Sequence, residues 1–167
     1  LETAEIAIKA AQTGHLVLST LHTRDAMSTP FRLLDMGVPP FMVSTSLQAV
    51  IAQRLVRLNC KECAAPHKPS PQEQGWLDTM LAEGETANPK RGMGCSACNE
   101  GYKGRTGVYQ VMPLTESIAK IILSGGSAIQ IADQAREDGI RDLRASALLK
   151  ARNGITSLAE INRVTKD

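Results

Sequence analysis

The chain has 167 residues, of which 43% are hydrophobic and 22% are charged, and its net charge at pH 7 is +2. This composition is typical of a globular protein and excludes wholesale disorder, while the small net charge gives no reason to expect a nucleic acid or an acidic membrane surface as partner. No apolar run reaches the ~18 residues of a membrane-spanning helix, and no segment resembles a cleavable export signal. Because the first residue is not a methionine, we expect the chain to be a fragment of a longer protein.

The beginning of the chain predicts a helix followed by a strand. Residues 2–12 are rich in Ala and unbranched side chains, which favours a helix, and Gly14 follows as its C-terminal stop. Residues 15–21 form a short apolar run with the length of a buried strand. Buried strands of this type favour a parallel sheet covered by helices, so we expect an α/β fold here.

The remainder of the first 59 residues predicts a second helix and a second strand. The helix covers 26–36 and ends at Gly37. Residues 41–58 begin with a helix-like pattern, and 50–58 are compatible with a strand. About 60 residues are marginal for burying an independent core, so we expect residues 1–59 to pack abnormally or to pair with another copy.

The middle of the chain, residues 60–107, changes character because cysteine, glycine and proline dominate it. This composition predicts a small, loop-rich module. One helix is expected inside it, over 70–83, where Ser70 is suited to cap the N-terminus. The end of the module, 101–107, predicts turns, and 108–112 then alternate as a strand does.

The last part of the chain predicts short helices separated by glycines. The final helix opens with Ser157 and Glu160, whose spacing fits a capping box. We expect a bundle of short helices within residues 108–167, at 115–123, 127–138, 142–153 and 157–164.

Four cysteines form two C-x-x-C pairs, Cys60 with Cys63 and Cys95 with Cys98. A tetrahedral Zn²⁺ prefers soft thiolate ligands, and each C-x-x-C turn can present two of them to one ion. Four thiolates fill the coordination sphere and leave no position for a reactive water, so the spacing predicts a structural zinc site.

The sequence is also compatible with other interpretations of the cysteines. They could be free or disulfide-bonded, although the lack of an export signal favours a reducing compartment. Redox chemistry would need only one pair. His67 lies four residues beyond Cys63 and could in principle be a ligand. A zinc site by itself does not identify a function.

Polar side chains follow the predicted strand at 15–21. Thr20, His22 and Thr23 are placed at the end of the strand, where open α/β sheets bind ligands and where these side chains could contact a phosphate. His15 begins the same strand. A single histidine is as often a structural residue as a ligand, so the spacing alone does not decide.

Several segments, in order along nearly the whole chain, resemble the secretion ATPase superfamily of pilus and type II secretion motors. Residues 13–25 look like its histidine box, and Leu1-Glu2-Thr3-Ala4 resembles residues shortly after its Walker B strand. The other matches are Gln53-Arg54-Leu55-Val56-Arg57 before the cysteines, Gly101-Tyr102-x-Gly104-Arg105-Thr106-Gly107-Val108-Tyr109 after them, and Thr156-Ser157-x-x-Glu160-x-x-Arg163-Val164-Thr165 at the end. The cysteine module resembles assembly and secretion motors rather than retraction motors, and it does not separate pilus assembly from type II secretion.

The resemblance implies a domain division and an assembly. Residues 1–59 would be the C-terminal part of a RecA-like ATPase domain, 60–107 a tetracysteine zinc module and 108–167 a helical domain. The full-length protein would be a cytoplasmic homo-hexamer, peripheral at the bacterial inner membrane. It would use ATP and Mg²⁺ to drive an inner-membrane platform protein that adds pilin or pseudopilin subunits.

The resemblance also implies roles for single residues. His22 would match the histidine near the γ-phosphate, and His15 the other histidine of the box. Arg54 and Arg57 would contribute at the nucleotide site or at a subunit boundary, and a solvated or structural role is an equal alternative for both.

The sequence departs from a complete motor in one respect. It contains no G-x-x-x-x-G-K-[ST] loop to hold phosphates and supply a lysine, and the Walker B carboxylates would precede Leu1. Glu2 and Glu5 fit an ordinary helix start, where acidic residues suit the helix dipole. We therefore expect negligible ATPase activity from this chain alone.

Two alternative classes of function place different demands on the sequence. A zinc-ribbon nucleic-acid-binding module would need clustered basic residues with stacking aromatics, whereas the basic residues here are scattered and 3% of the chain is aromatic. A salt-dependent binding test would decide. A structural interaction module without motor ancestry is the other alternative, and the ordered resemblance argues against it.

Overall fold

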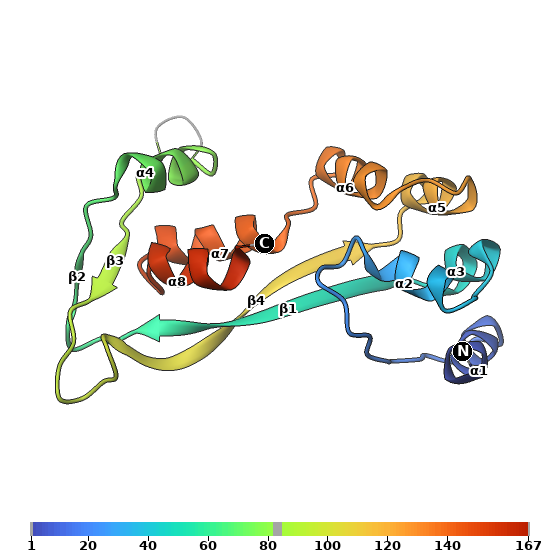
Figure 1. The fold of residues 1–167 in the computed structure, drawn as a ribbon, viewed down its shortest axis with the longest axis horizontal. Helices are drawn as coiled ribbons and strands as arrows, with labels where there is room; N and C mark the ends of the chain where they lie inside the picture. The colour runs from blue at the N-terminus through green and yellow to red at the C-terminus, as the bar shows by residue number, and fades with distance from the viewer. Residues whose placement is uncertain (1, 82–84, 167) are drawn as a thin grey trace. The chain divides into compact units, whose positions relative to one another are not determined.

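The computed structural model describes residues 2–81 and 85–166, and it has an α/β fold (Figure 1). Within those residues lie eight helices and two small sheets of two strands each. The predicted α/β class is confirmed. None of the described helices is long and apolar enough to cross a membrane.

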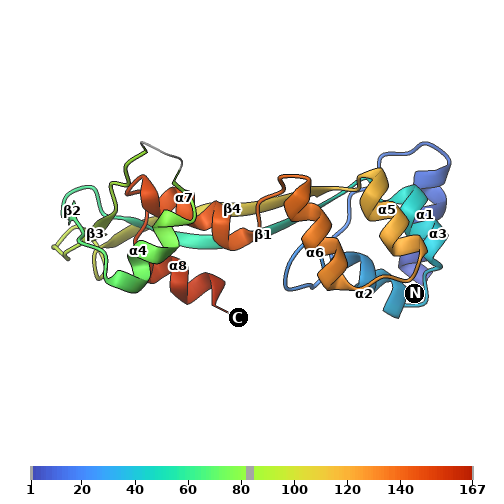
Figure 2. The same cartoon turned by 90° about the horizontal axis from the view of Figure 1, so that it is seen from above.

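Two long strands, β1 (Ala49–Asn59) and β4 (Tyr102–Pro113), pair with each other. They lie side by side in both views (Figures 1 and 2), and Figure 1 shows their arrows pointing in opposite directions. The predicted strands at 50–58 and 108–112 are therefore present. The prediction of turns over 101–107 is wrong for all but its first residue, because pairing with β1 keeps this glycine-rich stretch extended. Gly104 adopts a φ of 82° within the strand, a backbone conformation that other residues rarely accept.

The chain forms two compact units, each built from two separate stretches. The first unit contains residues 1–52 and 110–141, and the second contains 53–109 and 142–167. Both long strands contribute residues to each unit. These units do not follow the predicted division at residues 59 and 107, which remains a prediction about sequence modules.

In the first unit, five helices pack around one apolar core. They are α1 (Glu2–Gln12), α2 (Thr29–Asp35), α3 (Pro40–Ser46), α5 (Glu116–Leu123) and α6 (Ala128–Glu137). The core includes Val43 of α3, Ile118 and Ile122 of α5, Ile131 of α6 and Met112 of β4. Helices α1 and α6 occupy the ranges predicted for them to within one residue, whereas α2 begins three residues later than expected.

In the second unit, three helices and a short hairpin share another core. The elements are β2 (Ala64–Pro66), α4 (Pro71–Asp78), β3 (Lys90–Gly92), α7 (Leu143–Arg152) and α8 (Leu158–Thr165). Val56, Leu77, Val108, Leu148 and Ile161 are buried together. Ser70 caps α4 as predicted, although the helix ends at Asp78 and residues 82 and 83 of the predicted range lie outside the described part.

The four C-terminal helices are present, but they are divided between the units. Helices α5 and α6 pack in the first core, and α7 and α8 pack in the second. A single C-terminal bundle is thus not confirmed. The helix ranges were predictable because each N-terminus has its own capping side chain, from Thr115, Ser127, Asp142 and Ser157.

The predicted buried strand at 15–21 is absent from this structure. Residues 15–23 have no helix or strand, and Leu16 and Leu18 are 87% and 86% exposed. A strand needs a neighbour to pair its backbone groups, and no described strand pairs with this segment. Abnormal packing of residues 1–59 and pairing with another copy both stay predictions.

Candidate metal centre and the histidine segment

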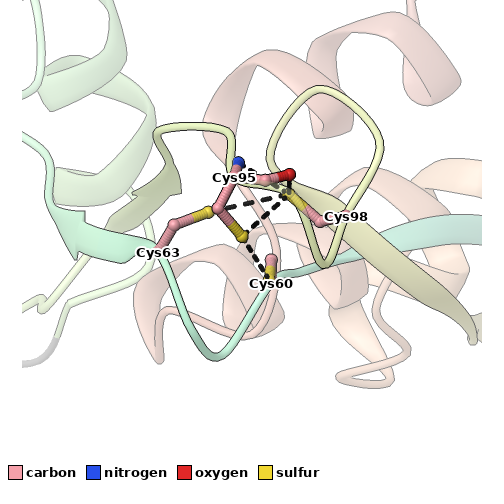
Figure 3. Close-up of side chains that lie close together, drawn as sticks. All are labelled: Cys60, Cys63, Cys95 and Cys98. Carbon is pink, nitrogen blue, oxygen red and sulfur yellow. Dashed lines mark hydrogen bonds between the residues drawn. The ribbon is translucent and has the colours of Figure 1, made fainter.

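Four cysteines from two distant stretches meet at one point of the second unit (Figure 3). Cys60 directly follows β1 and Cys63 precedes β2, while Cys95 and Cys98 lie in the turn between β3 and β4. The β2–β3 hairpin brings the pairs together, because Ala64 is registered opposite Gly92. All four Sγ atoms lie within 4.8 Å of one another, so the group can hold a metal ion.

Backbone contacts fix the two cysteine turns. The N–H of Cys60 donates to the carbonyl of Gly101 at 2.8 Å, and the N–H of Gly94 donates to Sγ of Cys63 at 3.3 Å. Gly92 and Gly101 approach backbone to backbone so closely that a Cβ on either would overlap the other. Gly101 also has a φ of 86°. Glycine is thus required at both positions for the turns to meet.

Hydrogen bonds connect the four thiols, with Sγ of Cys95 3.6 Å from Sγ of Cys98. Burial opposes ionisation of Cys98, but hydrogen bonds from the backbone and thiol of Cys95 lower its pKa to about 7. A backbone hydrogen bond from Ala97 favours the Cys95 thiolate, yet contacts with the other thiols, Cys98 first, raise the Cys95 pKa to about 12. A divalent cation removes this competition because it stabilises thiolates at all four positions.

The geometry decides between two interpretations that the sequence left open. The Sγ atoms of Cys60 and Cys95 are 3.9 Å apart, and those of Cys63 and Cys98 are 3.8 Å apart. These separations far exceed a disulfide bond of ~2.05 Å, so no disulfide joins the four cysteines. His67 is not part of the group, since its Nε2 lies 3.2 Å from the Glu73 carboxylate. The donor set of four soft thiolates fits zinc.

The predicted phosphate-contacting residues are not gathered around a pocket. His15, Thr20 and His22 are exposed, and Nδ1 of His15 lies 3.1 Å from Oγ1 of Thr13. Oγ1 of Thr23 lies 2.8 Å from Oγ1 of Thr29, near the start of α2. Because the strand that would carry them is absent, a nucleotide role for these residues stays a prediction.

The two candidate arginines have different surroundings. Nη1 of Arg54 donates to the carbonyl of Gln53 at 3.0 Å. Arg57 binds the buried carboxylate of Glu160, to which its backbone N–H, Nε and Nη2 donate at 3.0, 3.0 and 2.9 Å. Its guanidinium also lies 4.0 Å from the ring centre of Tyr102. The structure therefore gives Arg57 a clear structural partner.

Glu160 is the residue whose importance the sequence analysis missed. Burial opposes its ionisation, but hydrogen bonds from Arg163 and Arg57 lower its pKa to about 2. Ser157 accepts the backbone N–H of Glu160 at 3.1 Å, so half of the predicted capping box forms. The second capping-box contact, from the N-cap backbone N–H to the Glu160 side chain, was predicted wrongly. The Glu160 carboxylate binds the arginines instead. A signal was available in the spacing of Glu160 and Arg163, three residues apart on one helical face.

Comparison with known proteins settles the family. A sequence profile described as "Type II/IV secretion system protein" matches residues 1–163. The chain belongs to this family. The predicted relationship to type IV pilus assembly and type II secretion motors is confirmed by curated relatives of both kinds.

Two relatives and one solved structure define the likeness. The type IV pilus assembly ATPase PilB of Pseudomonas aeruginosa is 52% identical over 171 residues, covering 100% of this chain and 30% of PilB. The type II secretion system ATPase E of Vibrio cholerae is 42% identical over 172 residues, covering 100% of this chain and 33% of the relative. A crystal structure of the pilus retraction motor PilT with bound ADP shares the fold, with a TM-score of 0.64 at 21% identity over 100% of this chain and 37% of PilT. The chain spans about a third of the length of these relatives.

Proposed function

We propose that this chain is the C-terminal part of a motor ATPase that powers type IV pilus assembly. The observation that carries the proposal is the 52% identity to PilB along the entire chain. Type II secretion is the second candidate, supported by the 42% identity to an ATPase of that system. The higher identity favours pilus assembly.

In this proposal the ATP-hydrolysing centre needs residues beyond this chain. The sequence lacks a G-x-x-x-x-G-K-[ST] loop, so neither a phosphate-binding lysine nor the Mg²⁺-binding hydroxyl of that loop is present. Residues 1–59 would complete a RecA-like domain in the full-length protein, with His15, Thr20, His22 and Thr23 near the nucleotide. The chain alone would not hydrolyse ATP.

The cysteine cluster has a structural role in this proposal. Zn²⁺ held by Cys60, Cys63, Cys95 and Cys98 would cross-link the end of β1 to the start of β4 and fix the β2–β3 hairpin. Support comes from the closeness of the four Sγ atoms and from the absence of a fifth ligand position in a tetrathiolate site. The full-length protein would act as a cytoplasmic homo-hexamer, at the inner membrane, against a platform protein.

Chimeric motors distinguish the two candidate systems. This chain would replace the matching C-terminal segment of P. aeruginosa PilB in one chimera and of V. cholerae ATPase E in the other. We expect surface pili to be restored in the first host and protein secretion not to be restored in the second. The reverse pattern would move the assignment to type II secretion, and failure in both hosts, with both chimeras stably produced, would reject the motor role.

The absence of intrinsic activity needs its own measurement. Phosphate release from ATP by the purified chain is expected to equal that of a buffer control. Turnover that co-purifies with the chain and scales with its concentration would contradict the assignment of the catalytic centre to other residues.

A further inference from the structure

Three arginines line an open pocket of the second unit. The pocket has a volume of about 470 Å³ and is bounded by Leu55, Arg57, Arg105 and Arg163. Leu55 and Arg57 alternate along β1 and therefore lie on one face of the strand, Arg105 lies on β4 and Arg163 on α8. Three like charges at one pocket repel one another unless an anion balances them.

Buried Glu160 balances part of this charge and holds two of the guanidinium groups in place. Its Oε2 accepts from Nε and Nη2 of Arg57 at 3.0 and 2.9 Å and from Nε of Arg163 at 2.9 Å. Its Oε1 accepts from Nη2 of Arg163 at 2.7 Å. These contacts use one edge of each guanidinium and orient it. Nη1 of Arg163 is left for a ligand, whereas Nη1 of Arg57 already lies 3.7 Å from the carboxylate of Glu100.

The charges around the pocket leave an excess of positive charge. Within the described part of the chain, Arg105 has no carboxylate partner. The Glu100 carboxylate lies 3.7 Å from Nη1 of Arg57 and is 79% exposed. An exposed pair at this distance contributes little, so it does not compete strongly with a multivalent anion. The Arg163 side chain is 59% exposed and can be reached from solvent.

We propose that this pocket binds the phosphate group of a small anionic ligand. A guanidinium presents a planar fork of N–H donors that matches two phosphate oxygens, and the three oxygens of a terminal phosphate can serve several such forks. A carboxylate offers only two oxygens and a single charge. Leu55, which is 49% exposed, supplies an apolar wall for the organic part of the ligand. Glu160 acts here as a positioning residue.

The proposal does not rest on the proposed motor function, and of the lining residues only Arg57 was also predicted to contribute at the nucleotide site. The ligand phosphate could belong to a soluble compound or to a lipid headgroup. Calorimetric titration with inorganic phosphate, pyrophosphate and ADP tests the soluble source, with acetate as the carboxylate comparison. Co-sedimentation with phosphatidylcholine vesicles, with and without phosphatidic acid, tests the lipid source.

The decisive variant is Arg105→Gln, because Arg105 makes no described ion pair whose loss would disturb the fold. We expect this variant to lose affinity for the phosphate compound by about 10-fold or more, as removal of a charge-assisted contact requires. Arg136→Gln is the matched control, since it removes the same charge from an exposed pair with Asp133 in the first unit. Its affinity should equal that of the unmodified protein.

Each outcome decides the proposal. Binding of phosphate, pyrophosphate or ADP that is weakened by Arg105→Gln alone supports a soluble ligand. Sedimentation only with phosphatidic acid vesicles, lost in Arg105→Gln, supports a lipid headgroup. Equal affinity in both variants, acetate bound as tightly as phosphate, or no binding in either assay would overturn it. Arg105→Gln is expected to melt at the same temperature as the unmodified protein. Thermal melting therefore shows whether a loss of binding is caused by unfolding.

Discussion

The cysteine cluster and the histidine segment differ in how far the structure organises them. Both were singled out in the sequence, yet the four cysteine sulfurs converge within 4.8 Å while residues 15–23 are irregular. The cysteines depend on a hairpin and two strands whose partners all lie within the described chain. The histidine segment pairs with no described strand. A strand persists only where neighbouring backbone groups satisfy its hydrogen bonds.

Removal of the metal should have the largest effect on the second unit. Chelation, or Cys95→Ser, is expected to abolish binding of one zinc per chain and to lower stability, because structural Zn²⁺ contributes on the order of 10 kcal/mol of apparent folding energy. Elemental analysis with a thiol count and thermal melting would measure both changes. Ser96→Ala, in the same turn but without a thiolate, is the control. Full zinc content in Cys95→Ser would contradict a four-thiolate site.

Glu160→Gln should have the next largest effect. The change removes the negative charge to which Arg57 and Arg163 donate, and breaking a buried ion pair costs about 3 kcal/mol. Both arginines are partly exposed and can be hydrated when the carboxylate is neutralised. We therefore expect the free energy of unfolding to fall by about 2 kcal/mol. Urea unfolding would measure it against Glu116→Gln, an exposed pair with Lys120 that should change stability by less than about 0.5 kcal/mol. Equal effects in the two variants would refute the importance of the buried pair.

The same carboxylate should make the second unit sensitive to acid. Because its folded pKa of about 2 is below the unfolded value of about 4.5, the stability from its ionised form is complete above about pH 5. It is lost as pH falls through about 2. Unfolding free energies measured across this range should decline less steeply in Glu160→Gln than in the unmodified chain. Parallel declines would assign the acid sensitivity to other groups.

The smallest effect is expected in the histidine segment. Leu18→Asn should change stability by less than about 0.5 kcal/mol, because this side chain is 86% exposed and loses no packing. Leu77→Ala, in the second core and fully buried, should cost about 3 kcal/mol. A large loss from Leu18→Asn in thermal melting would show that the segment is buried in solution, against another part of the chain or a second copy.

Much of the site and many of the helices were predictable because their signals are local. Ser127 and Asp142 accept hydrogen bonds from backbone groups three residues ahead, so the helix starts could be located without any tertiary contact. The two C-x-x-C turns likewise specify their ligand pairs by short spacing. The tertiary structure had only to bring the two C-x-x-C turns together, which the β2–β3 hairpin does.

The failed predictions all concern partners distant in sequence. The glycine-rich stretch after Cys98 became part of a long strand because β1 pairs with it. Glu160 left its expected capping contact because the Arg57 backbone and guanidinium, 103 residues away, bind its carboxylate. Neither interaction leaves a periodic or compositional signal in the neighbourhood of the residue concerned.

Residue type and short spacing were enough to indicate the family, the paired cysteines and the capped helix starts. The length of β4, the contacts of Glu160 and the irregular backbone of residues 15–23 depend on the tertiary structure. The physical reason is that a backbone hydrogen bond can be satisfied locally in a helix, whereas a strand or a buried carboxylate requires a partner from elsewhere in the chain.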